Sequence, residues 1–237
     1  MDLEGRVIAI AGAAGGLGPV VAARIAEQGA SLALTDRDQS RLDALVGDLA
    51  IGSERVDSTV VDLLDESAAA GWADALGERF GRVDGLLHLV GGWRGGEPLA
   101  TAPLADYEWL HDLLVRTVIN TTRAFHDALA ASEHGRFVLV SSSQAQAPGG
   151  TNAAYGATKA AAESWTLALA DSFRIAGSAA TANILVINAS VTPQMREQNP
   201  DNAYKTFTST GQIADALVFI CSDSAAKMNG KRLPLYP

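Results

Sequence analysis

The run Arg6-Val-Ile-Ala-Ile-Ala11, followed at once by Gly12-Ala-Ala-Gly15-Gly16-Leu17-Gly18, determines how this chain begins to fold. The first half is a short apolar run of strand type, and residues 19–28 after the glycines have the apolar periodicity of a helix. In such a strand–turn–helix unit, glycines let backbone N–H groups approach phosphates, and the helix N-terminus adds a partial positive charge. The sequence therefore predicts a dinucleotide pyrophosphate site, although the spacing G-x-x-x-G-x-G differs from the commoner G-x-G-x-x-G. The residues of this predicted site are Gly12, Gly15, Gly16, Leu17 and Gly18.

Strand-like and helical stretches alternate along the rest of the chain. The strand-like runs are Val7–Ala11, Ser31–Thr35, Val56–Val61, Gly85–Val90, Arg136–Val140, Ala182–Ile187 and Arg232–Leu235. The helical stretches are 17–28, 39–50, 65–80, 106–131, 152–176 and 210–222. Continuous apolar strands separated by helices predict an α/β fold. We expect one Rossmann domain over residues 1–237, with a doubly wound, mostly seven-stranded parallel sheet, helices on both faces and ligands at the carboxyl ends of the strands.

Composition and charge narrow the class of protein. The chain has 237 residues, 48% hydrophobic and 19% charged, which is typical of one soluble domain with a sizeable core. A formal net charge of -9 argues against nucleic acid or an anionic membrane as partner. The histidines lack metal-ligand spacing, so we expect no metal site. The acidic start Met1-Asp2-Leu3-Glu4 and the absence of a long apolar run favour the cytoplasm.

Tyr155 and Lys159 are four residues apart, with Ser142 thirteen residues upstream of Tyr155. Residues at i and i+4 share one face of a helix, so the ammonium can favour the phenolate and lower the pKa of a phenol toward neutral. A nearby serine hydroxyl can polarise a carbonyl by hydrogen bonding. These three residues are the predicted catalytic group for interconverting an alcohol and a ketone.

With the glycine loop, Asp36, Asp62-Leu63 and Ser142/Tyr155/Lys159 in this order and spacing, the chain resembles the short-chain dehydrogenase/reductase family nearly end to end. The resemblance implies an oxidoreductase that uses NAD, or NADP, on a small carbonyl or alcohol substrate. Tyr155 would be the general acid and base, while Lys159 would hold the nicotinamide ribose. Asp62 and Leu63 would lie by the adenine. Family members associate through the two long helices at 106–131 and 152–176, which implies a homodimer or homotetramer.

Asp36 closes the second predicted strand, where a carboxylate can bind both ribose hydroxyls of NAD and repel the 2′-phosphate of NADP. Arg37 follows and offers a cation to that phosphate, so NADP stays open. Two simpler readings also stay open: Asp36 caps a turn, and Asp62 is a solvated loop carboxylate.

The chain departs from the family pattern at several positions. His88-Leu89-Val90-Gly91 stands where the family has Asn-Asn-Ala-Gly, with Val90 and Gly91 still expected beside the cofactor. Leu114 aligns with the asparagine that holds a proton-relay water in the family. Ile187-Asn188 replaces a Pro-Gly pair that contacts nicotinamide. Thr192 is retained, and its hydroxyl is expected to bind the carboxamide.

The loop Val90-Gly91-Gly92-Trp93-Arg94-Gly95-Gly96 resembles a loop of the dihydropteridine reductases. Like this chain, those enzymes lack the family's active-site asparagine. Unlike this chain, which keeps Ser142, they generally lack the active-site serine. Reduction of a quinonoid pterin is therefore the alternative activity. Trp93 and Arg94 are candidate substrate-binding residues. The alternative is a structural role, in which Trp93 covers the edge of the core and Arg94 is solvated. A further alternative is a nucleotide sensor that has lost the chemistry.

Overall fold

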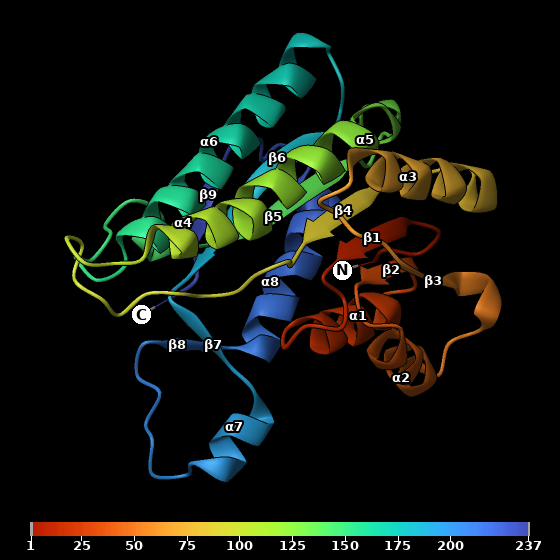
Figure 1. The fold of residues 1–237 in the computed structure, drawn as a ribbon. Helices are drawn as coiled ribbons and strands as arrows, with labels where there is room; N and C mark the ends of the chain where they lie inside the picture. The colour runs from red at the N-terminus through yellow and green to blue at the C-terminus, as the bar shows by residue number, and fades with distance from the viewer. Residues whose placement is uncertain (1, 237) are drawn as a thin grey trace.

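Seven parallel strands form the central sheet of the computed structural model, which describes residues 2–236, in the order β3-β2-β1-β4-β5-β6-β9. These strands are β1 Val7–Ala11, β2 Ser31–Asp36, β3 Val56–Val60, β4 Gly85–His88, β5 Arg136–Ser142, β6 Thr181–Ile187 and β9 Arg232–Pro234. The order runs outward in both directions from the boundary between β1 and β4, which makes that boundary the topological switch point. The predicted seven-stranded, doubly wound sheet is confirmed (Figure 1).

Helices cover both faces of the sheet. They are α1 Gly18–Glu27, α2 Gln39–Leu49, α3 Glu66–Phe80, α4 Leu104–His111, α5 Thr117–Ala131, α6 Ala153–Ile175, α7 Pro193–Gln198 and α8 Thr210–Cys221, with short 3-10 turns at Ser53–Arg55, Ser143–Ala145 and Asp223–Ala225. Because side chains alternate along a strand, β1 sends Ile8 and Ile10 into a core with α1, α2 and α8. Ala9 and Ala11 face the other core, under α3, α5 and α6 (Figure 1). None of the described helices is both long and apolar enough to cross a bilayer.

Two features differ from the prediction. The helical stretch 106–131 is interrupted by a π-helical turn at Asp112–Arg116, where the amide of Thr117 donates to the carbonyl of Asp112. After β6, residues Ala189–Val191 (β7) and Phe207–Ser209 (β8) pair in parallel as a separate two-stranded sheet. The chain between β7 and β8 carries α7 and projects below the main sheet (Figure 1).

Candidate active site

A cavity of about 950 Å³ lies at the carboxyl ends of the strands, where the switch point predicts a ligand. It joins the glycine loop after β1 to the end of β5 and the first turns of α6. The predicted residues that line it are Gly12, Gly15, Gly16, Leu17, Asp36, Arg37, Asp62, Leu63, Val90, Gly91, Trp93, Ser142, Tyr155 and Lys159. The predicted residues that do not line it are Gly18, Arg94 and Thr192.

The glycines of the loop serve different purposes. Gly12 has φ +80°, and a Cβ there would lie 2.8 Å from the backbone nitrogen of Val90, so the loop and β4 approach more closely than any side chain permits. A Cβ on Gly16 would meet nothing within 4 Å, which leaves open space above the start of α1. A Cβ on Gly18 would lie 2.0 Å from the carbonyl oxygen of Ala13. Gly18 therefore packs within the turn and is not part of the cavity wall.

Asp36, at the end of β2, is bound to the glycine loop. Its Oδ2 atom accepts from the amide of Ala14 at 3.0 Å, and its Oδ1 atom accepts from the amide of Arg37 at 2.8 Å. Arg37 and Arg41 both line the cavity beside it, and neither forms an ion pair with a carboxylate of residues 2–236. Sequence reasoning missed Arg41, whose spacing of four residues from Arg37 was the available signal.

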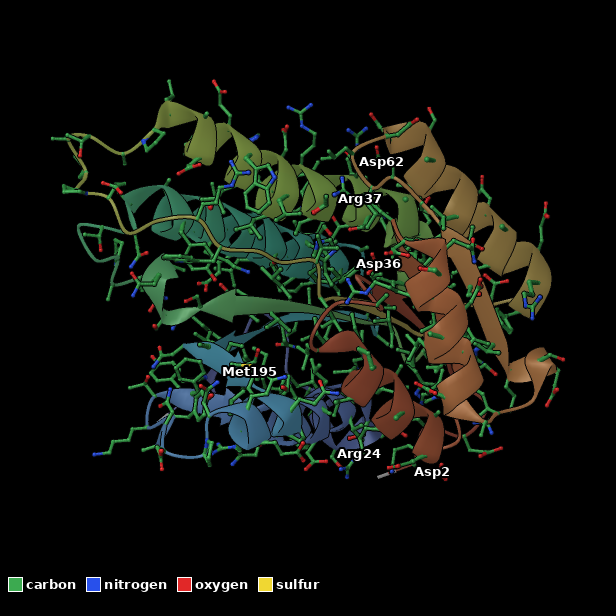
Figure 2. The ribbon with its side chains drawn as sticks, turned by 60° about the horizontal axis from the view of Figure 1, so that its bottom comes forward. Asp2, Arg24, Asp36, Arg37, Asp62 and Met195 are labelled. Atoms are coloured by element: carbon green, nitrogen blue, oxygen red, sulfur yellow. The ribbon has the colours of Figure 1, made fainter. Side chains whose placement is uncertain are left out.

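Asp62 follows β3, and its Oδ1 atom accepts from the amide of Leu64 at 3.0 Å while the residue lines the cavity. Figure 2 shows Asp36, Arg37 and Asp62 near one another at this end of the molecule. Asp36, Asp62, Arg37 and Arg41 all line this part of the cavity, so their formal charges cancel. The local charge alone does not decide between a ribose hydroxyl and a phosphate.

Ser142, Tyr155 and Lys159 meet at the other end of the cavity. Lys159 is buried, donates from Nζ to the carbonyl of Val140 at 3.0 Å, and lies 5.9 Å from the ring centroid of Tyr155. Burial raises the pKa of Tyr155, and the Ser142 hydroxyl lowers it by a smaller amount. Burial also lowers the pKa of Lys159 to about 8, against the opposing effect of Glu163.

The expected lowering of the phenol's pKa by Lys159 is therefore absent from the protein alone. Desolvation outweighs any charge attraction because removal from water penalises the phenolate and the ammonium alike. At neutral pH this environment keeps Tyr155 protonated.

Leu114 is buried in the π-helical turn and does not line the cavity. Its neighbours Leu113 and Thr117 do, and Thr117 Oγ1 donates to the carbonyl of Leu113 at 2.7 Å. His88, at the end of β4, lies behind Thr117 with Nε2 3.1 Å from Thr117 Oγ1 and is 1% exposed. Asn120 instead donates to the carbonyl of Leu63 at 2.9 Å, so it does not substitute for the family's asparagine.

The segment after β6 reaches the cavity through Asn188, Ala189 and Ser190. Ser143 donates to Oδ1 of Asn188, which ties the ends of β5 and β6 together. Thr192 was predicted to bind a carboxamide, but its Oγ1 accepts from the amide of Met195 at 3.1 Å as the N-cap of α7. The sequence did contain this signal, because threonine before Pro193 is a typical helix start.

Trp93 and Arg94 separate in the structure. Trp93 lines the cavity, is 58% exposed and donates from Nε1 to Oδ1 of Asn152 at 3.1 Å. Arg94 turns away to pair with Asp106 at 3.1 Å and to stack over the ring of Trp109 at 4.2 Å. Trp109, which sequence reasoning missed, lines the cavity in place of Arg94. Gln144 and Asn152 are two further polar wall residues that it missed.

Within residues 2–236, no group of histidine, cysteine or acidic side chains has the arrangement of a metal site. The polar groups that line the cavity include hydroxyl, phenol, ammonium and amide groups.

Comparisons with known proteins identify the family of this chain. The family model described as short chain dehydrogenase matches residues 6–203. The chain is 29% identical over 242 residues to the (2S)-[(R)-hydroxy(phenyl)methyl]succinyl-CoA dehydrogenase subunit BbsD of Thauera aromatica, covering 98% of this chain and 96% of that protein.

Two solved structures share its fold. An NAD+-bound xylitol dehydrogenase has a TM-score of 0.86 at 22% identity, covering 100% of this chain and 99% of that one. An NADPH-bound short chain oxidoreductase from Pseudomonas aeruginosa PAO1, described as containing an atypical catalytic center, has a TM-score of 0.87 at 23% identity, covering 99% of this chain and 96% of that one. The sheet order, the glycine loop and the family match together place this chain in the short-chain dehydrogenase family of oxidoreductases.

Proposed function

We propose that this oxidoreductase interconverts a carbonyl and an alcohol on a small substrate, with a nicotinamide dinucleotide as the hydride carrier. One observation carries the proposal: a continuous cavity has open space over Gly16 at one end and Ser142, Tyr155 and Lys159 at the other. The residues fit such a cofactor, because the open space lies at the start of α1, where backbone N–H groups favour phosphate. When bound, the cofactor supplies or accepts the hydride.

The chain's own residues would handle the proton and the substrate oxygen. Ser142 would donate its hydroxyl hydrogen to the carbonyl oxygen, which polarises the carbonyl. Tyr155 would give the proton to the forming alkoxide in reduction and take it back in oxidation. With its pKa raised by burial, Tyr155 is protonated at neutral pH, which is the form that a proton donor in reduction needs. Lys159 would hold the nicotinamide ribose and stabilise negative charge on the phenol oxygen.

NAD is the proposed cofactor, with NADP as the alternative. Asp36 supports NAD because a carboxylate binds ribose hydroxyls and repels a 2′-phosphate. Arg37 and Arg41 support NADP because they line the same part of the cavity. The two structural relatives described above hold one cofactor each, NAD+ and NADPH.

The test is cofactor oxidation across a panel of aldehydes and ketones, each offered with NADH and with NADPH. The proposal expects turnover of at least one carbonyl, strongly reduced in Tyr155→Phe and in Ser142→Ala. Tight NADH binding without turnover of any carbonyl would contradict it and favour a nucleotide sensor.

A second candidate activity is the reduction of a quinonoid pterin. It is supported by the resemblance of the Gly-Gly-Trp loop to that of the dihydropteridine reductases. In the structure this loop packs closely, since a Cβ on Gly92 would lie 2.7 Å from Leu113 and 2.8 Å from Trp109. The same loop places Trp93 in the cavity wall, where its ring offers a flat surface to a planar ligand. Ser142→Ala separates the two activities, since a pterin needs no carbonyl donor and its reduction should survive that substitution.

A further inference from the structure

Three consecutive residues at the end of β5 are each held by a different charged side chain. Lys159 Nζ donates to the carbonyl of Val140 at 3.0 Å. Ser141 Oγ donates to Oε1 of Glu163 at 2.6 Å. Arg232 Nη2 donates to the carbonyl of Ser142 at 3.4 Å. The backbone that presents the Ser142 hydroxyl is therefore fixed residue by residue.

The carboxylate of Glu163 pairs with one of these two cations, Arg232, and its charge raises the pKa of the other, Lys159. Its second oxygen, Oε2, accepts from Nε of Arg232 at 2.9 Å, which leaves Glu163 bonded on both oxygens. Glu163 is 6% exposed and follows Lys159 by one helical turn, so Tyr155, Lys159 and Glu163 occupy the same face of α6. Arg232 comes from β9, at the edge of the sheet beside β6.

We propose that Glu163 and Arg232 are positioning residues of the active site, holding the charge of Lys159 and the backbone of Ser142 in the arrangement that proton transfer needs. The role in proton transfer rests on the proposed function, whereas the experiment below does not require that function. A buried carboxylate beside a buried ammonium stabilises the charged form of the amine, whereas a second cation opposes it.

Removing the carboxylate changes the local charge in a predictable way. Lys159, Glu163 and Arg232 together carry a formal charge of +1, and Glu163→Gln would remove the anion that pairs with Arg232 and favours the charged form of Lys159. The other groups facing Lys159 are Tyr155 on α6 and His88 on β4, whose positive form is strongly disfavoured by burial. Glu163 is thus the anion that supports the ammonium, in agreement with its effect on the pKa of Lys159.

The chain contains four lysines, at 159, 205, 227 and 231, which makes a direct titration feasible. Protein labelled with 13C at lysine Cε would be titrated by NMR without cofactor, and the Lys159 signal assigned by its loss in Lys159→Arg. The unmodified protein should give a midpoint near the pKa of about 8. Glu163→Gln should lower that midpoint by about one pH unit or more. The double variant Glu163→Gln/Arg232→Met also removes one cation, so its midpoint should return toward that of the unmodified protein.

Arg82→Met is the matched control, because Arg82 pairs with the buried Asp84 at 2.6 Å next to the start of β4. It removes a comparable ion pair and should leave the Lys159 midpoint unchanged. An unmoved midpoint in folded Glu163→Gln would overturn the proposal, as would an equally low midpoint in the double variant. Because the titration needs neither substrate nor cofactor, it stands even when no carbonyl is turned over, and failure of the proposed function is recognised separately in the substrate panel.

Discussion

The carboxylate of Asp36 accepts a hydrogen bond from the amide of Ala14 at 3.0 Å, which joins the end of β2 to the middle of the glycine loop. A carboxylate oxygen has two lone pairs, so each oxygen of Asp36 keeps acceptor capacity after binding one backbone amide. Turn capping and ribose binding are therefore compatible roles for the same side chain. This relationship sets the first prediction.

Asp36→Ala should weaken NADH and strengthen NADPH. Charge-assisted hydrogen bonds to the ribose hydroxyls are worth about 1.5–3 kcal/mol, so the unmodified protein should prefer NADH by roughly ten- to a hundredfold. Fluorescence titration of both cofactors checks the result, with Asp43→Ala on the outer side of α2 as control. Equal affinity for the two cofactors in the unmodified protein would mean that Arg37 and Arg41, not Asp36, set the choice.

Tyr155→Phe should lower turnover by about 10²- to 10⁴-fold, the usual contribution of general acid–base catalysis. The ring and its packing remain, so cofactor affinity should stay nearly unchanged. Steady-state kinetics on the best carbonyl of the panel, together with a binding titration, measure both quantities. Turnover at the unmodified rate would remove Tyr155 from the mechanism.

Gly16→Ala and Gly18→Ala should affect different properties, cofactor affinity in the first and folding stability in the second. A Cβ at Gly18 would overlap the carbonyl of Ala13, so this variant should lose roughly 1–3 kcal/mol or more of unfolding free energy. A Cβ at Gly16 enters open space in the cavity, so this variant should keep its stability and lose NADH affinity. Urea unfolding and NADH titration on both variants make the comparison. Equal stability of the two variants would contradict the packing role of Gly18.

His88 should make the protein sensitive to acid. Burial lowers its pKa from 6.5 to about 3, so between these values the unfolded chain binds a proton that the folded protein does not. The free energy of unfolding is therefore not reduced by this residue above pH 6.5. It falls by on the order of a few kcal/mol as the pH falls from 6.5 toward 3. His88→Asn should flatten the fall in unfolding free energy over this range, whereas His111→Asn on the partly exposed end of α4 should not. Identical pH profiles for unmodified protein and His88→Asn would refute the prediction.

We expect a homo-oligomer formed through α4, α5 and α6. Apolar side chains on these helices remain accessible, among them Trp165 at 37% and Leu167 at 45% exposure. Sedimentation at micromolar concentration should give a dimer or tetramer, and Leu167→Glu should shift it toward monomer. Val60→Glu, at a similarly exposed position on the edge strand β3, is the control. A stable monomer of the unmodified protein would contradict this expectation.

The sheet was predictable because its information is local and repeated. Most of the strands are short apolar runs, with β3 and its polar residues Asp57, Ser58 and Thr59 as an exception, and the glycine loop after Ala11 fixes where the first helix begins. The positions at the strand ends follow from this topology, which is why the sequence predicts Asp36, Asp62 and Ser142 at one edge of the sheet.

The structure departs from the sequence prediction where the position of a side chain depends on tertiary contacts. Arg94 has Asp106 and the ring of Trp109 within reach, and neither contact is encoded in its own segment. The π-helical turn was also hidden, because one extra residue in a turn hardly alters the apolar pattern of 106–131. That turn nonetheless determines which side chains after Leu113 face the cavity.

The three side chains that bind the end of β5 also separate a rigid part of the molecule from the rest. β5, α6 and β9 are cross-linked by Lys159, Glu163 and Arg232, so any closure over a substrate must leave this block intact and take place elsewhere. The chain from Asn188 to Ser209 reaches the cavity from outside the block, through a short parallel strand pair. Under the proposed function, proton transfer and substrate entry would belong to separate parts of the chain, so substitutions in residues 188–209 would change the accepted substrate without disturbing the proton donor.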